Sequence, residues 1–225
     1  MNRRNFNRIL LYGGLSLLLP SISHSKSKRL IYTFDDVPYE RDRMEGLINI
    51  LNDNECMFYF TGDGIKNYPE SVEFLADKGY SIGWHSMHHD IMPRKNNKEF
   101  LDDILNWKNV LKDVVPEYQP KYARFPYGLG NYEQVSILIS EGLLIKDHAI
   151  RSTIAHNWDV DSIDWHPTLK RNYKTMHHMI RKIRSNKSIV LLFHLQLAKP
   201  LNFKFGIVKE SFITSDLEKF KMYIG

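Results

Sequence analysis

Arg29-Leu-Ile-Tyr-Thr-Phe-Asp-Asp-Val-Pro38 is a run of apolar, β-branched and aromatic residues that ends in two adjacent carboxylates. The run predicts a buried strand, and Pro38, which cannot continue a central strand, marks its end. Neighbouring side chains of a strand point to opposite faces, so Asp35 and Asp36 can serve one site only where the extended chain stops. Taken alone, the pair is equally consistent with a surface turn.

The rest of the chain alternates helix and strand patterns. Apolar residues at helical spacing predict helices over 42–53, 69–78, 97–115, 131–141, 173–185 and 215–223. Short apolar runs predict strands at 56–60, 80–84, 122–126, 143–145, 153–155 and 188–193. Strands that alternate with helices imply a parallel sheet with helices outside it, so we expect a single barrel-like or doubly wound α/β domain.

Length, charge and cysteine content narrow the class of protein. The 225 residues suffice for one domain with a substantial core. The net charge of +5 includes three arginines near the N-terminus, and the remainder carries about +2, so composition gives no support for a nucleic-acid partner. Cys56 is the only cysteine, which excludes an internal disulfide and a cysteine-rich zinc site.

The stretch 1–25 has the three-part layout of a secretory signal peptide. Three arginines precede the apolar run 9–19, and small residues surround the expected cleavage point at Ser25-Lys26. The apolar run is too short to span a bilayer comfortably, which favours a cleaved signal over a permanent anchor. Asn2-Arg-Arg-Asn-Phe6 also resembles a twin-arginine signal, so the export route stays open. We expect residues 26–225 to be exported to the periplasm, cell envelope or exterior of a bacterium.

Chemically reactive side chains recur where the predicted strands end. His85-Ser-Met-His-His89 follows one strand, and a helical turn would place its first and last imidazoles on one side. Arg124-Phe-Pro-Tyr127 follows another, Asp161-Ser-Ile-Asp-Trp165 a third, and His194 ends the last. A lone pair of histidines at this spacing is weak evidence for a metal site. The series is stronger evidence, because α/β folds place their chemistry at the carboxyl ends of strands.

The order of these motifs resembles that of the polysaccharide deacetylases with a NodB-homology domain, carbohydrate esterase family 4. The likeness runs through nearly all of 30–225 and rests on Thr33-Phe-Asp-Asp36, His85-Ser-Met-His-His89, Arg124-Phe-Pro-Tyr-Gly128, Asp161-Ser-Ile-Asp-Trp165 and Leu192-Phe-His194. It implies a distorted (β/α) barrel, with 26–225 as a single catalytic domain. The implied activity is hydrolysis of N-acetyl groups on N-acetylhexosamine residues of peptidoglycan, a chitin-like glycan or an exopolysaccharide.

The resemblance also implies one divalent metal, with Zn²⁺ expected and Co²⁺, Ni²⁺ or Mn²⁺ as other candidates. Its ligands would be Asp36, His85 and His89, and three protein ligands leave an open position for water and substrate. Asp35 would be the base that takes the proton of the activated water. The backbone N–H of Tyr127 would help to hold the oxyanion.

The remaining implied roles concern the leaving amine and the pocket walls. His194 would protonate the amine, and Asp164 would raise the pKa of His194 by stabilising the imidazolium. Arg124 would pair with Asp35 and keep it ionised. A purely structural role also stays open for Arg124 and for Asp164, because buried ion pairs can stabilise a barrel without taking part in catalysis. Substrate would contact Trp165, Leu192 and Tyr127. For Trp165 and Leu192, a place in the core is an equally good interpretation.

Two departures from the family pattern put rate and substrate in doubt. Val37 stands where the family usually has glycine, and a β-branched residue adopts a positive φ only at a cost, so we expect a differently shaped or displaced loop. Leu195-Gln-Leu lacks the aspartate often seen after the motif histidine. Neither change removes a metal ligand or a proton-transfer group.

Two alternatives to N-deacetylation stay open. The same groups could hydrolyse O-acetyl esters or a small amide. A catalytically silent glycan-binding domain is the other alternative, although such a domain should have lost a ligand or the base. In every case we expect an N-acetylated or related glycan as partner, a monomer, and no membrane-spanning segment after signal cleavage.

Overall fold

The computed structural model describes residues 29–51, 55–145, 157–162, 164, 173–183 and 188–196. The expected signal peptide, the elements predicted at 153–155 and 215–223, and Trp165 lie outside these residues. No described helix combines the length and apolar character needed to cross a membrane.

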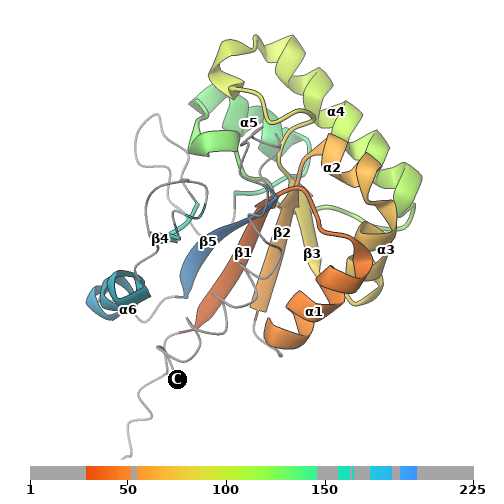
Figure 1. The fold of residues 1–225 in the computed structure, drawn as a ribbon. Coiled ribbons are helices and arrows are strands. Elements are labelled where there is room, and N and C mark those ends of the chain that lie inside the picture. Colours follow the sequence, from red (N-terminus) through yellow and green to blue (C-terminus); the bar gives the residue numbers. More distant parts are fainter. Residues whose placement is uncertain are drawn as a thin grey trace, which may run out of the picture.

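A parallel sheet forms the centre of the described part (Figure 1). Its strands are β1 (Leu30–Asp36), β2 (Glu55–Phe60), β3 (Ser81–Trp84), β4 (Val160–Asp161) and β5 (Ile189–Gln196). The spatial order is β3-β2-β1-β5-β4, so the strand that ends in the aspartate pair is central. The predicted parallel α/β architecture is therefore confirmed.

The strands predicted at 122–126 and 143–145 are only partly right. Each is reduced to isolated bridges, Trp84 with Ala123 and Tyr122 with Leu144, which extend the sheet edge beyond β3. A longer strand does not form because the chain turns at Pro126 into a short 3-10 helix, Pro126–Gly128. Strand β4 was not predicted.

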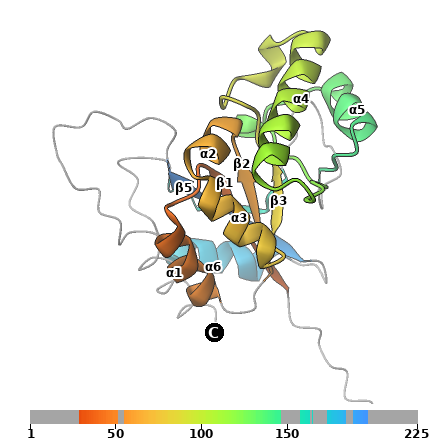
Figure 2. The ribbon, with the colours of Figure 1, turned by 90° about the vertical axis from the view of Figure 1, so that its right-hand side faces the viewer.

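The described helices surround this sheet. They are α1 (Arg41–Leu51), α2 (Gly62–Asn67), α3 (Pro69–Asp77), α4 (Asn97–Val114), α5 (Tyr132–Ser140) and α6 (Tyr173–Lys182). All but α2 were predicted to within a few residues. Figure 2 shows α2, α3 and α4 packed side by side, while α6 lies next to edge strand β4 (Figure 1). Helix α2 begins at Gly62, and the side chain of the preceding Thr61 caps it by accepting the Gly64 N–H at 3.1 Å.

Aromatic side chains fill the core beneath the site. The ring of Phe34 on β1 lies 5.4 Å from that of Phe58 on β2 and 5.7 Å from that of Phe193 on β5. All of these side chains are buried, so the three central strands are fixed to one another below their carboxyl ends. The polar residues that follow the strands are thereby held on a rigid base.

Candidate active site

Asp35 and Asp36 both face one pocket at the end of β1. Strands β1 and β5 change register between these two residues, and Asp36 has a left-handed φ of 80°. This break in the strand allows neighbouring carboxylates to serve one site, as the sequence required. Asp35 binds Arg124 and lies 3.8 Å from Nε2 of His85, whereas Asp36 contacts both His85 and His89.

Val37 does not carry the left-handed conformation for which a glycine would be suited. Among the described non-glycine residues, positive φ values occur at Asp36, Ser86, His89 and Tyr127. The turn beside the candidate base therefore falls one residue earlier, on an aspartate, which tolerates a positive φ better than a β-branched residue does. Val37 itself does not adopt a positive φ, so its β-branched side chain causes no backbone strain there.

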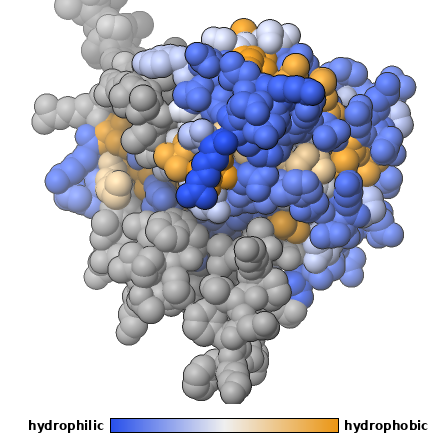
Figure 3. Space-filling model, turned by 90° about the horizontal axis from the view of Figure 1, so that it is seen from above, coloured by the Kyte–Doolittle hydropathy of each residue, from blue (hydrophilic) through white to orange (hydrophobic). Residues whose placement is uncertain are grey.

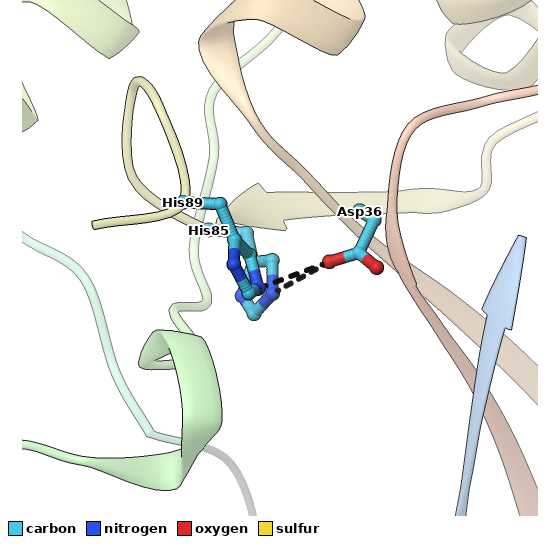
Figure 4. A group of neighbouring side chains, drawn as sticks. All are labelled: Asp36, His85 and His89. Carbon is cyan, nitrogen blue, oxygen red and sulfur yellow. Dashed lines mark ion pairs between the residues drawn. The ribbon is translucent and has the colours of Figure 1, made fainter. Parts of the chain in front are cut away.

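Asp36, His85 and His89 converge on one point (Figure 4). Oδ1 of Asp36 lies 3.4 Å from Nε2 of His85 and 3.1 Å from Nε2 of His89. Ligands about 2.0–2.1 Å from a tetrahedral zinc would lie about 3.3 Å apart, so these separations suit such an ion. The same Oδ1 atom is buried and has no hydrogen bond among the described residues, a costly state that a cation would relieve.

Protonation states also favour a cation at this point. Nδ1 of His85 lies 2.9 Å from the carbonyl oxygen of Arg124, which can only accept, so Nδ1 carries the proton and the Nε2 lone pair faces Asp36. Burial alone would raise the pKa of Asp36, but the neighbouring His85 and His89 rings, together with the charge of His194, hold that pKa well below its usual value. The three residues therefore fit a divalent metal.

The segment from His85 to His89 does not form the helical turn that the spacing of its histidines would allow. The segment is a loop in which Ser86 and His89 adopt left-handed φ values of 66° and 57°. The loop still brings the two imidazoles together, with ring centroids 5.0 Å apart. A hydrogen bond of 2.9 Å from His89 N to Ser86 Oγ closes it.

Arg124 is fully buried and holds the candidate base Asp35. Its Nη1 donates to Asp35 Oδ1 at 2.7 Å and to Thr33 Oγ1 at 2.8 Å. Its Nε and Nη2 donate to the side-chain and backbone oxygens of Asn157 at 2.6 and 3.1 Å. The predicted pairing of Arg124 with Asp35 is present, but half of the guanidinium is bound by Asn157. Sequence analysis missed Asn157, which no motif marks.

His194 and Asp164 form the pair expected for a proton donor. Nδ1 of His194 lies 2.6 Å from Asp164 Oδ1, and the backbone N–H of His194 donates to Oδ2 at 2.8 Å. Burial by itself would lower the pKa of His194, but the hydrogen bond and negative charge of Asp164, with Asp35 and Asp36 behind it, raise the pKa to about 9. Since Nδ1 is engaged, Nε2 is the nitrogen left for a reacting group.

One pocket of about 1030 Å³ is lined by Asp35, Asp36, His85, His89 and His194, and also by Leu192, Tyr127 and Asp161. Arg124 and Asp164 do not line it but bind Asp35 and His194, which do. Tyr127 has a φ of 58°, its ring lies 4.6 Å from that of His89, and its backbone N–H donates to no other described residue. Trp158, which sequence analysis missed, forms another wall and lies 5.5 Å from the Arg124 guanidinium. Figure 3 views the face at which the strands end, where polar residues dominate the described surface.

Comparison with known proteins connects this geometry to one family. The polysaccharide deacetylase family model matches residues 23–145, more than half of the chain. The chain is 27% identical over 159 residues to chitin deacetylase 1 of Saccharomyces cerevisiae, covering 71% of this chain and 48% of that protein. It is also 27% identical over 151 residues to a peptidoglycan-N-acetylglucosamine deacetylase of Bacillus cereus, covering 65% and 51%. The chain spans about half the length of these curated relatives.

Solved structures support the fold. The chain superposes on a family 4 carbohydrate esterase from Streptomyces lividans, solved in complex with acetate, with a TM-score of 0.63 and 21% identity over 88% of each chain. This likeness confirms the distorted (β/α)-barrel fold expected from the sequence.

Proposed function

Because the chain belongs to the polysaccharide deacetylase family, we propose that it is a metal-dependent hydrolase that removes N-acetyl groups from N-acetylhexosamine residues of a glycan. The observation that carries this proposal is the convergence of three groups in one pocket. They are the Asp36, His85 and His89 cluster, Asp35, which Arg124 binds, and His194, which Asp164 binds.

A divalent metal held by Asp36, His85 and His89, with zinc as the expected ion, would activate a water and polarise the acetamide carbonyl. Asp35 is the proposed base that accepts the proton of the attacking water. Its Oδ1 is already bound to Arg124, so its second oxygen remains for that proton. The Tyr127 N–H, which adjoins the pocket and has no partner among the described residues, would donate to the developing oxyanion.

Expulsion of the amine is the step for which His194 is suited. An amine is a poor leaving group unless it gains a proton, and an imidazole whose pKa is raised to about 9 holds that proton at neutral pH. His194 Nε2 would donate it, and Asp164 would stabilise the charged ring beforehand. This pair favours amide over ester substrates, because an ester releases an alcohol that needs less assistance.

The walls of the pocket are proposed to contact the sugar and its acetyl group. Leu192 and Tyr127 lie at the pocket, which supports their expected roles, and Trp158 offers a further apolar surface. Trp165 remains proposed from the sequence resemblance alone.

We also propose that the protein is exported and that its signal peptide is cleaved. Residues 1–25 would be removed as a signal peptide, and the catalytic domain 26–225 would work as a monomer in the cell envelope or outside the cell, where glycan polymers occur. The intact mass of the exported protein would test the cleavage site, and gel filtration with light scattering would test the monomer.

The test of function is acetate release from N-acetylglucosamine oligomers and from peptidoglycan. Wild type should release acetate, Asp35→Asn should not, and the exposed α4 variant Asp102→Asn should match wild type. If wild type releases no acetate from either glycan, N-deacetylation of these substrates is wrong. An O-acetylated glycan and a glycan-binding assay would then separate esterase activity from silent binding.

A further inference from the structure

We infer that Asp103, a buried residue of α4 outside the pocket, positions the metal-binding loop 85–90 for the ion. The inference rests on the proposed metal site and concerns how the protein holds His85 and His89 in place. Asp103 touches neither imidazole, so it acts through its bonds to the loop.

The carboxylate of Asp103 is bound to the loop at two places. Its Oδ1 accepts from the indole Nε1 of Trp84 at 3.2 Å and from the backbone N of Met87 at 3.1 Å, while Oδ2 lies 3.3 Å from the same Met87 N. Trp84 directly precedes His85, and Met87 lies midway between the two histidines. Asp103 therefore fixes the beginning and the middle of the loop.

Lys95 connects the same carboxylate to the end of the loop. Its Nζ lies 3.1 Å from Asp103 Oδ2 and 2.9 Å from Asp90 Oδ2, and Asp90 directly follows His89. The side chain of Asp103 is only 1% exposed, and Lys95 supplies the counter-charge that a buried carboxylate needs.

The loop needs such support because its backbone is strained. Ser86 and His89 both hold left-handed φ values, which are unfavourable for non-glycine residues and persist only where surrounding contacts enforce them. The opposite side of the loop is held by α2, where Gly62 N and Asp63 N donate to the carbonyls of Ser86 and Met87 at 2.9 and 3.0 Å. The loop is thus clamped between α2 and Asp103.

A carboxylate suits this position better than an amide. Its two oxygens accept from an indole N–H, a backbone N–H and an ammonium group at once. Asparagine would present one oxygen and an NH₂ group to the same donors, so at least one donor would lose its acceptor. Asp103→Asn therefore removes the support with little change in volume.

The test compares Zn²⁺ affinity in Asp103→Asn, Lys95→Gln and wild type, by competition with a chelating dye, with thermal melting alongside. Asp102→Asn, the exposed neighbour on the same helix, is the matched control. Loss of a residue that orients metal ligands typically weakens metal binding by about 10–100-fold, and we expect this range for Asp103→Asn. Lys95→Gln should show a smaller loss in the same direction, and Co²⁺-loaded Asp103→Asn should show an altered visible spectrum.

The outcomes separate this inference from the proposed function. If Asp103→Asn melts at a lower temperature but binds Zn²⁺ with wild-type affinity, the residue is merely structural and the inference is overturned. If Asp103→Asn does not fold, an unchanged affinity in Lys95→Gln overturns it instead. Wild type that binds no Zn²⁺ overturns both claims. Wild type that binds Zn²⁺ but releases no acetate contradicts the proposed function, while the affinities still decide the role of Asp103.

Discussion

Nδ1 of His194 lies 2.6 Å from Oδ1 of Asp164, and the second oxygen of that carboxylate accepts the backbone N–H of His194 at 2.8 Å. One carboxylate thus fixes both the ring and the backbone of the proposed acid. The partners lie 30 positions apart in the sequence, so the pair exists only in the folded chain.

The pH dependence of acetate release should report this pair. Asp164→Asn removes the main contribution that raises the pKa of His194, while burial, which lowers it, remains. The protonated ring is then lost at a lower pH, so we expect the alkaline limb of log kcat/KM to move down by about one pH unit or more. A bound divalent metal would offset the charge of Asp36, which also contributes to the pKa of His194. The quantity to compare is therefore the difference in the alkaline limb between Asp164→Asn and wild type. An unchanged alkaline limb would argue against His194 as the acid.

Arg124 should be among the most sensitive positions for stability. Arg124→Met removes the partner of the buried Asp35 carboxylate and leaves that charge uncompensated, which costs about 3–5 kcal/mol of unfolding free energy. Arg124→Lys keeps the charge but cannot reach Asp35 and Asn157 with the same planar set of donors. Its free energy of unfolding should therefore lie between those of Arg124→Met and wild type. Urea unfolding at pH 7 measures both. An unfolding free energy of Arg124→Met within about 1 kcal/mol of the wild-type value would contradict a stabilising role for the Arg124–Asp35 pair.

Asn157 should affect activity through Arg124 and Asp35. Asn157→Ala removes the acceptor of the Arg124 Nε–H and leaves that buried donor unpaired, at a cost of about 1–3 kcal/mol. Because Asn157 does not contact the metal ligands, acetate release should fall while Zn²⁺ affinity stays at the wild-type value. Asn109→Ala on the exposed face of α4 is the control and should change neither quantity.

Gly83 should tolerate no side chain. A Cβ at this position would lie 2.8 Å from the carbonyl oxygen of Tyr122 and 2.8 Å from Cδ1 of Tyr59, so the backbone beside β3 would have to move. We expect Gly83→Ala to lower the unfolding free energy by about 1–3 kcal/mol. Gly46→Ala is the matched control, because nothing lies within 4 Å of a Cβ there and its helical position should gain about 0.5–1 kcal/mol. Equal melting temperatures for the two variants would contradict the packing described around β3.

The local sequence was sufficient to predict a strand and the reactive side chains at its end where both lie in one continuous stretch. The apolar runs of β1, β2, β3 and β5 mark their own ends, and parallel pairing places those ends at one edge. The residues that follow these strands could therefore be expected near one another, although the assignment of Asp36 and His85 to one metal site came from the family resemblance. The capping signal Thr61 was available for α2, but the helix has six residues and too few apolar positions to show a period.

Other features depend on contacts between distant residues. The spacing of His85 and His89 fits a helical turn, yet bonds from α2 and Asp103 hold the segment as a strained loop, and spacing alone cannot report those bonds. Asn157 reaches Arg124 across 33 positions without any motif. The left-handed φ at Asp36 rather than at Val37 coincides with the register change between β1 and β5, which exists only when the sheet is formed.

The most direct test of the central claim is a titration of metal-stripped protein with Zn²⁺, in which bound metal and acetate release are measured on the same samples. We predict no acetate release without metal, and a rise in proportion to bound Zn²⁺ that levels off at about one ion per chain, the number that a single three-ligand site can hold. Asp36→Ala should bind no ion at that site and stay inactive. Full activity of the metal-stripped protein, or activity in Asp36→Ala equal to wild type, would contradict the proposed metal-dependent mechanism.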